Sequence, residues 1–406
     1  MSKELLPLET ALTRLLDEAR PRIEPVSVDT MDAAMRVLAA DVRSTLDVPA
    51  MDNTQMDGYA VRAADVRPGA RLPVSQRIPA GTVGQALATG TAARIFTGAW
   101  IPEGADAVVM QESTTADGDH VIFNEVPEPG AWVRRRGEDI AAGSVILPAG
   151  TRLTPQALGL AASVGLAQLP VARPLRVACF FTGDELAMPG EPLRPGAIYN
   201  SNRFMLVSLL QQMGCEVTDL GIVPDSLERT RAALRQAAAD NALIVTSGGV
   251  SVGEEDHVKP AVEAEGELRL WQLNIKPGKP LAYGQIRRAA GGGPAHFIGL
   301  PGNPVSSFVT FLMLVRPFIQ RLQGMTGGPP IRLPLVAAFD LPRGDRRREF
   351  LRARLTAEGA LELFRNQGSA VLTSTVWGDG LIDNPPGNAI RRGDLVSFIP
   401  FASLMD

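Results

Sequence analysis

The spacing of apolar residues predicts a chain that begins with helices and then becomes rich in strands. Leucines recur every three or four positions within residues 6–20, which is typical of an amphipathic helix that Pro21 ends. Residues 29–40 predict a second helix. From residue 46 to residue 140, short β-prone runs alternate with Gly and Pro, so we expect an inserted β-rich module. Residues 154–167 then return to helix-forming composition.

The middle of the chain predicts a doubly wound α/β domain. Apolar runs at 175–181, 217–223 and 242–245 have the composition of buried parallel strands, and the patterns between them predict helices at 201–213 and 226–239. Strands and helices that alternate at this length favour a sheet with helices on both faces. Sheets of this kind bind ligands outside the carboxyl ends of their strands.

The end of the chain predicts a small β-barrel or sandwich, because short alternating runs follow the Gly- and Pro-rich segment 327–330. A length of 406 residues suggests about two to four domains. The fold class is therefore α/β multidomain. We expect four parts: a helical linker domain (1–45 plus 141–173), an inserted β-rich domain (46–140), an α/β domain (174–327) and a C-terminal β-barrel domain (328–406).

Composition excludes several classes of protein. A net charge of −4 leaves no general basic footprint for nucleic acid. No positively charged leader precedes an apolar stretch, and no apolar run reaches the roughly 18 residues of a membrane helix. We therefore expect a cytoplasmic protein with neither nucleic acid nor membrane as a partner. Cys179 and Cys215 lie in apolar runs and predict buried free thiols.

Three loops of the predicted α/β domain carry residue types that suit a polyanionic ligand. In the first loop, 246–256, Gly248 and Gly249 allow the backbone to approach a ligand, and Ser247 and Ser251 add hydroxyl groups. A flexible turn is the alternative. No P-loop consensus is present, so the pattern does not indicate a nucleoside triphosphatase.

The second and third loops carry positive charge and free backbone amides. Lys276 and Lys279 flank a Pro-Gly turn, which can hold both ammonium groups near one point. Gly302 and Asn303, which follow Pro301, precede an apolar helix and can offer N–H groups to an anion. A solvated turn and plain helix capping are the respective alternatives.

Acidic and basic clusters leave further alternatives open. Glu254, Glu255 and Asp256 suit either Mg²⁺, which needs one or two carboxylates plus ligand oxygens, or the start of a helix. Asp52 and Asp57 can supply oxygen ligands or form Asx-turns. The arginines at 134–136 and 343–354 form either a solvated face or a rim that binds anions.

Seven motifs together resemble the MoeA/gephyrin E-domain family of molybdenum cofactor biosynthesis. They occur in the order of that family and span nearly the whole chain. They are Asp52-Asn53 with Met56-Asp57-Gly-Tyr-Ala60, Phe96-Thr-Gly-Ala99, Gly137-Glu-Asp-Ile140, Thr182-Gly-Asp-Glu-Leu186, Ser247-Gly-Gly-Val-Ser-Val-Gly253, Ile275-Lys-Pro-Gly-Lys-Pro280 and Gly299-Leu-Pro-Gly-Asn-Pro-Val305.

The resemblance implies a molybdopterin molybdenumtransferase, which hydrolyses adenylyl-molybdopterin and inserts molybdate into the freed dithiolene with the help of Mg²⁺. It also implies a three-layer α/β domain of Mog-like topology, and a homodimer whose site lies between the α/β domain of one subunit and the β module of the other. A molybdopterin adenylyltransferase is a further implied partner. Two rival readings stay open: a molybdopterin adenylyltransferase and a non-enzymatic scaffold of the same fold.

Carried over residue by residue, the resemblance implies three groups of site residues. The catalytic residues are Asp57, Thr97, Asp256 and Lys276. The metal ligands are Glu185, Asp225 and Asp256. The residues that bind the cofactor are Ser247, Gly248, Gly249, Ser251, Lys279, Pro301, Gly302, Asn303, Asp139, Arg352 and Ser369.

The chain departs from the family pattern at a few positions. Gln272 stands where relatives often carry a basic residue, Ala370 replaces a histidine in the segment 368–371, and Gln55 replaces a small residue. These changes leave the choice between molybdate and tungstate open, while the reaction class stays the same.

Overall fold

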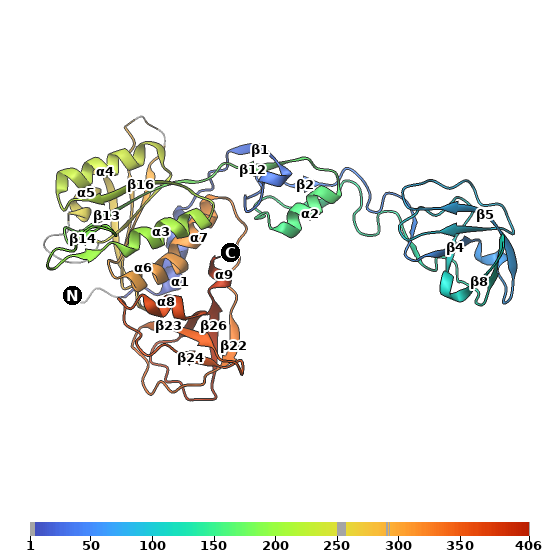
Figure 1. Cartoon of the computed structure of the whole chain (residues 1–406). Helices are drawn as coiled ribbons and strands as arrows, with labels where there is room; N and C mark the ends of the chain where they lie inside the picture. Colours follow the sequence, from blue (N-terminus) through green and yellow to red (C-terminus); the bar gives the residue numbers. More distant parts are fainter. Residues whose placement is uncertain (1–4, 250–256, 290, 292, 406) are drawn as a thin grey trace.

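The computed structural model describes residues 5–249, 257–289, 291 and 293–405. Figure 1 shows an elongated molecule: a large body at one end, a β-rich module at the other, and a slender linker between them. Ser251 and Asp256, both predicted in the site, lie outside the described residues.

A six-stranded mixed sheet forms the centre of the α/β domain. Its first four strands run parallel, three of them at the predicted apolar runs, and two further strands, which pair antiparallel, extend one edge. In sheet order the strands are β16 (Glu216–Val223), β13 (Arg176–Thr182), β17 (Leu243–Ser247), β21 (Ala295–Leu300), β20 (Pro280–Ile286) and β18 (Gly266–Gln272). A short pair, β14 (Leu186–Ala187) and β15 (Ile198–Tyr199), follows β13.

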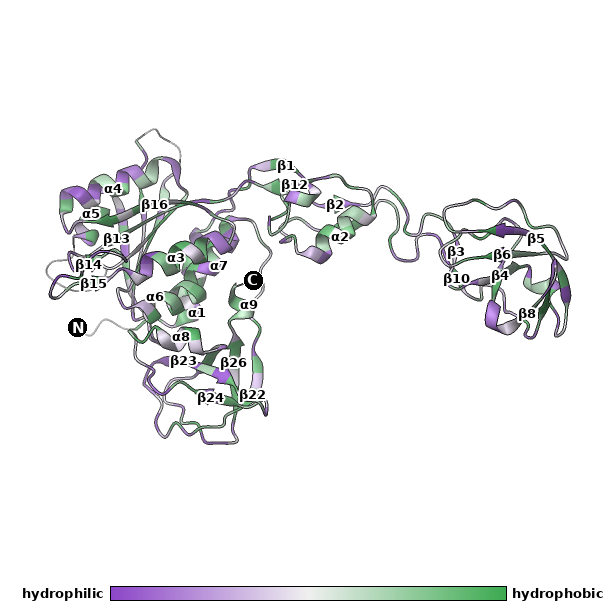
Figure 2. Ribbon diagram, viewed as in Figure 1, coloured by the Kyte–Doolittle hydropathy of each residue, from purple (hydrophilic) through white to green (hydrophobic). Residues whose placement is uncertain are grey.

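Helices cover both faces of this sheet because successive side chains of its strands point to opposite sides and both sides are apolar. On β13, Val177, Cys179 and Phe181 join one core, whereas Ala178 and Phe180 join the other. The first core contains α1 (Leu8–Glu18), α3 (Ser201–Gln212), α6 (Pro304–Thr310) and α7 (Arg316–Leu322), and the second contains α4 (Leu227–Asp240) and α5 (Val258–Glu265). The predicted three layers are therefore confirmed, and Figure 2 shows hydrophilic residues gathered on the outward side of α4.

The segment Pro304–Leu322 is the main core helix of the first layer. A π-helical stretch, η4 (Phe311–Val315), joins α6 to α7. This helix is long and apolar enough to cross a membrane, but 83% of its most apolar window is buried inside the fold. Its hydrophobicity therefore belongs to the core of the α/β domain.

The linker is less helical than the sequence predicts. The helix expected over residues 29–40 is wrong: the structure has only the 3-10 turn η1 (Thr30–Asp32), because Val37 and Leu38 pair with Arg152 and Val171 instead. The linker elements are β1 (Pro25–Asp29) with β12 (Gln168–Ala172), β2 (Val42–Arg43) with β11 (Val145–Leu147), and the predicted helix α2 (Pro155–Ser163). Helix α1, grouped with the linker by sequence, packs in the α/β core.

The inserted module is a six-stranded sheet, as the β-prone runs predict. Its order is β7 (Ala107–Met110), β4 (Gly58–Val61), β6 (Ala92–Ile95), β5 (Arg71–Ile78), β9 (His120–Phe123) and β8 (Thr114–Asp117), with the 3-10 turns η2 (Ala63–Asp65) and η3 (Gln111–Ser113). A short pair, β3 (Asn53–Thr54) with β10 (Val133–Arg134), connects it to the linker.

The C-terminal part closes into a small barrel. Its strands are β22 (Leu333–Val336), β23 (Arg348–Leu355), β24 (Leu361–Leu363), β25 (Gly380–Asn384) and β26 (Leu395–Pro400), with the short helices α8 (Thr373–Trp377) and α9 (Ala402–Met405). A bridge between Ala337 and Leu361 joins the two edges. One further strand, β19 (Ile275–Lys276), comes from the α/β domain and pairs with β23.

The barrel shares its core with the α/β domain. Phe401 is 6% exposed and packs edge-to-face on Phe308 with ring centroids 5.4 Å apart. Truncating a buried Phe removes its contacts and leaves a cavity, so we expect Phe401→Ala to lower the free energy of unfolding of this body by about 3–5 kcal/mol. Urea unfolding of the full chain measures the change. Val376→Ala, at a side chain 85% exposed, is the control, and equal effects of the two changes would contradict the shared core.

Candidate functional site

A cavity of about 790 Å³ lies where the carboxyl ends of the parallel strands meet the C-terminal barrel. Nine of the residues implied by sequence line it. They are Glu185, Ser247, Gly248, Lys276, Lys279, Pro301, Gly302, Asn303 and Ser369. The structure therefore brings together in one cavity most of the residues assigned to the α/β half of the site.

The three loops reach this edge because each of them follows a strand of the sheet that ends there. Strands β17 and β21 run parallel and end at Ser247 and Leu300, so the loops that follow them emerge side by side. The loop with Lys276 and Lys279 follows β18, which ends at Gln272, and leads into antiparallel β20 at Pro280. An antiparallel strand begins where its parallel neighbours end, so the loop arrives at the same edge.

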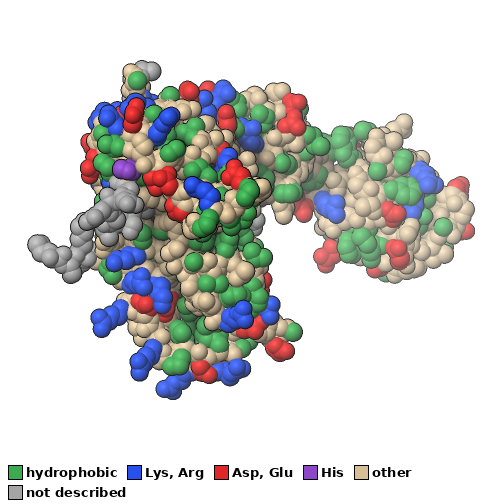
Figure 3. All heavy atoms as spheres, turned by 60° about the vertical axis from the view of Figure 1, so that its left-hand side comes forward, with side chains coloured by type: hydrophobic (Ala, Val, Ile, Leu, Met, Phe, Trp, Pro, Cys, Tyr) green, Lys and Arg blue, Asp and Glu red, His purple; other side chains and the backbone are tan. Residues whose placement is uncertain are grey.

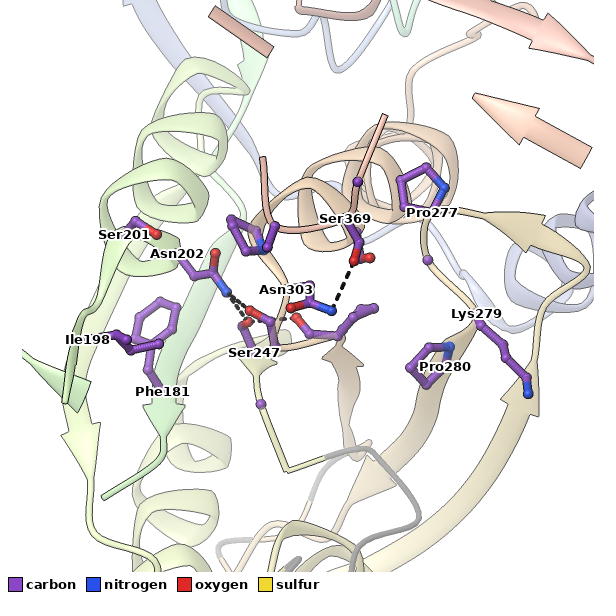
Figure 4. A pocket seen from close by; sticks show the side chains of 18 of the residues that line it. Phe181, Ile198, Ser201, Asn202, Ser247, Pro277, Lys279, Pro280, Asn303 and Ser369 are labelled. Atoms are coloured by element: carbon purple, nitrogen blue, oxygen red, sulfur yellow. Dashed lines mark hydrogen bonds between the residues drawn. The ribbon is translucent and has the colours of Figure 1, made fainter. Parts of the chain in front are cut away.

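Hydrogen bonds between side chains and loop carbonyls fix the floor of the cavity (Figure 4). The amide Nδ2 of Asn202, on α3, donates to Oγ of Ser247 and to the carbonyl of Gly302, both at 2.7 Å. The hydroxyl of Ser247 donates to the carbonyl of Pro301 at 2.9 Å. Sequence reasoning missed Asn202, because its position predicts only the first turn of a helix, which Asn200 caps in the structure.

Glycine is required twice at the end of β17. Gly248 has φ +99°, and a Cβ there would lie 2.7 Å from the carbonyl oxygen of Thr182. Gly249 has φ +62°, and its Cβ would lie 2.4 Å from a methyl of Val258. Gly248 lines the cavity but Gly249 does not. The alternative of an unconstrained flexible turn therefore fails, since both backbone positions exclude a side chain.

The C-terminal barrel holds Lys276 at the cavity. Lys276 pairs with Glu349 in the β19–β23 ladder, and its Nζ lies 3.2 Å from Glu349 Oε1 and 3.1 Å from Asp345 Oδ2. Partial burial acts to lower the pKa of Lys276, but hydrogen bonds to these two carboxylates outweigh it, so the pKa rises. Lys276 is therefore a fixed ammonium whose charge two carboxylates already balance.

Lys279 differs from Lys276 in having no such partner. It is exposed, lines the cavity, and its ammonium makes no ion pair with any residue in the described part of the chain. Arg347 also lines the cavity but pairs with Asp345 at 3.2 Å. Lys279 is thus the cavity cation that an incoming anion can bind without displacing a carboxylate.

The arginine cluster at 343–354 divides between structure and surface. Arg348 pairs with Asp383 at 2.5 Å and Arg354 pairs with Glu362 at 2.5 Å, whereas Arg343 and Arg346 are exposed. Figure 3 shows Lys and Arg side chains spread over the face of the C-terminal barrel. A second cavity of about 650 Å³, lined by Lys279, Arg346 and Arg347 among others, adjoins the first. Arg346 and Arg347 therefore lie at the edge of the two cavities, whereas Arg348 and Arg354 are paired with carboxylates of the barrel.

Arg352 does not face the cavity, contrary to the role implied by sequence. Its side chain is 1% exposed and donates to Oγ of Ser374 at 3.0 Å and to the carbonyl of Gly368 at 3.1 Å. Burial without a carboxylate partner lowers its pKa to about 10. It holds in place the loop that presents Ser369, whose Oγ accepts a hydrogen bond from Asn303 at 3.1 Å.

The residues implied as metal ligands come only partly together. Partial burial, together with the neighbouring carboxylates of Asp184 and Glu185, raises the pKa of Asp225, and a divalent cation would relieve that repulsion. Glu185 lines the cavity, whereas Asp225 does not, and Asp256 lies outside the described residues. Within the described ranges, no group of three acidic, histidine or cysteine side chains can hold a metal by itself.

The other half of the implied site is built at the far end of the molecule. Oδ1 of Asp57 accepts hydrogen bonds from the backbone N–H of Thr97 at 2.8 Å and from its hydroxyl at 2.7 Å. These two bonds lower the pKa of Asp57 and keep it ionised at neutral pH. Figure 1 shows the module with β4 at the opposite end from β13 and β23, so one chain does not bring Asp57 to Lys276.

Two other residues of the module have different surroundings. Asp139 lines a separate cavity of about 440 Å³ with Asn53 and Arg134, next to the linker. Asp52 pairs with Arg135 at 2.7 Å and accepts the backbone N–H of Arg136 at 2.8 Å. Asp52 therefore stabilises the segment 134–136, a simpler role than the open alternative of an oxygen ligand.

The contacts of Asp345 should make the stability of the fold depend on pH. Burial acts to raise the pKa of Asp345, but hydrogen bonds from Arg347 and Lys276 outweigh it and hold the pKa well below its usual value. A lowered pKa stabilises the fold above the unfolded value, near 3.9, and that stability is lost as pH falls through the folded value. We expect Asp345→Asn to cost about 1 kcal/mol of unfolding free energy at pH 7, and this cost should begin to shrink as the pH falls below about 4.

Urea unfolding at pH 7 and pH 3 measures this difference. Glu103→Gln, an exposed carboxyl in the β-rich module, is the control and should show no such dependence. A cost for Asp345→Asn that is the same at both pH values would contradict a role for its charge.

Comparisons with known proteins agree with this architecture along the whole chain. The family model of the MoeA N-terminal region (domains I and II) matches residues 6–165, that of the probable molybdopterin binding domain matches 178–321, and that of the MoeA C-terminal region (domain IV) matches 334–401. These three matches cover the linker with the β-rich module, the α/β domain and the barrel in turn.

Individual relatives are similar over nearly their full length. A molybdopterin molybdenumtransferase of Haemophilus influenzae is 39% identical and covers 99% of this chain and 100% of its own, and molybdopterin molybdenumtransferase 2 of Mycobacterium tuberculosis is 38% identical over 92% of this chain and 94% of its own. The crystal structure of a molybdopterin biosynthesis MoeA protein of Pyrococcus horikoshii superposes with a TM-score of 0.85 at 28% identity, covering 98% of this chain and 100% of that one. The chain therefore belongs to the MoeA family.

Proposed function

We propose that this chain is a molybdopterin molybdenumtransferase, which hydrolyses adenylyl-molybdopterin and inserts molybdate into the freed dithiolene. One structural observation supports the proposal in addition to the family membership. The C-terminal barrel contributes Ser369 to the cavity and holds Lys276 there through Glu349 and Asp345. The cavity is therefore a joint product of two domains, built for a reaction that needs both.

The charges of the cavity suit two anions, the phosphates of the pterin and the molybdate oxyanion. Lys279 offers an unpaired ammonium, and Lys276 offers a second that exchanges its carboxylate partners for a more highly charged ligand. Ser369, Gly302 and Asn303 add a hydroxyl group and backbone amides at the start of α6. Together these groups orient the anions and stabilise charge that develops during transfer.

We propose that Mg²⁺ binds at Glu185 and Asp225, with Asp256 as a third carboxylate. The raised pKa of Asp225 supports this, because partial burial and its carboxylate neighbours make the site favour an added positive charge. Bound there, the cation would supply Lewis-acid polarisation of the pyrophosphate. The residues of the chain would hold the phosphates against Lys279 in the orientation that the reaction needs.

The active unit is proposed to be a homodimer, in which Asp57 and Thr97 of one subunit complete the cavity of the other. The support is the distance between the two half-sites in the elongated chain, which Figure 1 makes plain. Asp57 is held ionised by Thr97 and would orient the attacking water or a molybdate oxygen. We propose a cytoplasmic enzyme, which fits the two buried free thiols Cys179 and Cys215.

The rival readings have less support. A molybdopterin adenylyltransferase, the neighbouring step, needs the α/β domain alone and gives no reason for the barrel to hold Lys276. A scaffold without catalysis gives no reason for the ionised Asp57, or for a Lys279 that has no ion-pair partner among the described residues and lines the same cavity as Glu185. Incubating the purified protein with adenylyl-molybdopterin, Mg²⁺ and molybdate tests all three: release of AMP that depends on molybdate supports the proposal, and no release overturns it.

The two-subunit site predicts that inactive variants complement each other. Asp57→Asn and Lys276→Gln should each abolish AMP release, because each damages a different half of every site. Mixing the two after reversible dissociation should restore about a quarter of wild-type activity, since half of the dimers are mixed and each mixed dimer has one intact site. The readout is AMP release per protomer.

Mixing either variant with itself is the control and should restore nothing. Circular dichroism establishes that both variants fold. A mixture that stays inactive although exchange of subunits is demonstrated would contradict the two-subunit site, while leaving the catalytic role of each residue to the single-variant data.

A further inference from the structure

A row of cationic and aromatic side chains lies beside Asp57 on the β-rich module. Arg94, on β6, stands directly opposite Tyr59 on one side and Arg77 on the other, so the three side chains share one face of the sheet. Phe96 is two residues beyond Arg94, just past the end of the strand. The ladder register therefore places two guanidinium groups and two aromatic rings together, immediately before Thr97.

The contacts within this row are cation–π contacts. The guanidinium carbon of Arg77 lies 4.7 Å from the centroid of the Phe96 ring, and that of Arg94 lies 4.5 Å from the same centroid. Arg94 is also 5.2 Å from the centroid of Tyr59. Such contacts hold long side chains in defined positions, because the guanidinium group lies over the aromatic ring.

The positive charge of the row is not neutralised. Neither Arg77 nor Arg94 makes an ion pair with a residue of the described ranges. Arg94 spends part of its donor capacity on the carbonyl of Gly58 at 2.8 Å and on Oε1 of Gln111 at 2.6 Å, so it also braces the turn that carries Asp57. Arg77 is exposed and its charge is free to bind an anion.

The positive charge of Arg77 and Arg94 would offset a repulsion that the proposed function implies. Asp57 is an ionised carboxylate, and by itself it would repel the pyrophosphate of adenylyl-molybdopterin. Two unpaired guanidinium groups beside it reverse the local field. Guanidinium planes and a phenyl ring also provide the surfaces on which a purine base stacks, while arginine binds a phosphate through two parallel hydrogen bonds.

We propose that Arg77, Arg94 and Phe96 form the subsite for the adenylate half of the substrate, with the base on the Arg77–Phe96 stack and the phosphate on the two arginines. The inference rests on the proposed function. It divides the substrate between the subunits: the pterin lies in the α/β cavity of one, and the adenylate lies on the β-rich module of the other. The adenylate phosphate is then next to Asp57 and Thr97.

Calorimetric titration of the full-length protein with AMP and with adenosine tests the subsite. Arg77→Gln removes an exposed charge without disturbing the brace at Gly58. We expect it to weaken AMP binding about tenfold and adenosine binding by a smaller factor, because only AMP also loses a phosphate contact. Phe96→Leu keeps an apolar side chain but removes the ring, and should weaken both ligands about three- to tenfold. Arg67→Gln, at an exposed arginine of the same module, is the matched control and should bind both as the wild type does.

The outcomes separate this inference from the proposed function. Unchanged AMP binding by both variants, or a wild-type protein that does not bind AMP at millimolar concentration, overturns the subsite. Molybdate-dependent release of AMP with an unchanged KM in Arg77→Gln also overturns it, although the proposed function would then stand. AMP binding that depends on Arg77 in a protein unable to release AMP from adenylyl-molybdopterin supports the subsite and overturns the proposed function.

Discussion

The pairing of β19 with β23 is the constraint on which the rest of the cavity depends. Two residues of the α/β domain, Ile275 and Lys276, add an edge strand to the sheet of the C-terminal barrel. Backbone hydrogen bonds of this kind set the position of Lys276 along the strand, and the carboxylates of Asp345 and Glu349 then set the position of its ammonium. Without the barrel, the loop 276–280 would have neither its strand partner nor its charge partners.

The same arrangement decides how the cavity responds to an anion. Glu349 is only 4% exposed, so its charge needs the hydrogen bonds it receives from Lys276, from the backbone N–H of Asp345 and from Asn384. The two carboxylates keep Lys276 in place but reduce the positive potential around it. Lys279 has no carboxylate partner among the described residues, so the cavity combines one positioned cation with one available cation. This combination favours a strongly charged ligand over a weak one.

The elongated shape of the chain keeps the two half-sites apart. The linker separates Asp57 from Lys276, and hydrogen bonds within its own end of the chain position each half-site. A rigid half-site at each end of the chain is an arrangement that suits assembly between two copies, because neither half must reorganise when they meet. The arginine row of the β-rich module is arranged in the same way, since Arg77 and Arg94 make no ion pair among the residues that the structure describes.

The features that could be predicted from the sequence are those that depend on residues close together along the chain. The apolar runs predict the parallel strands β13, β16 and β17, because a strand that is buried on both faces must be apolar along its length. The patterns between these runs predict the helices α3 and α4. Glycine at positions 248 and 249 is likewise a local requirement of backbone geometry. The order of the motifs was enough to identify the family.

Tertiary structure alone decided the features that depend on partners distant in sequence. Residues 29–40 have helical composition but pair with strands of the linker, since long-range pairing outweighs a weak local preference. Arg352 is at a family position yet is buried behind the loop of Ser369, because the barrel turns its side chain inward. Asn202, Asp345 and Glu349 belong to the cavity only through contacts that no spacing reveals. The sequence by itself therefore determined most strands and helices of the α/β domain and the residue types available to the site. The packing of the barrel on the α/β domain decided which charges face the ligand and which are paired with one another.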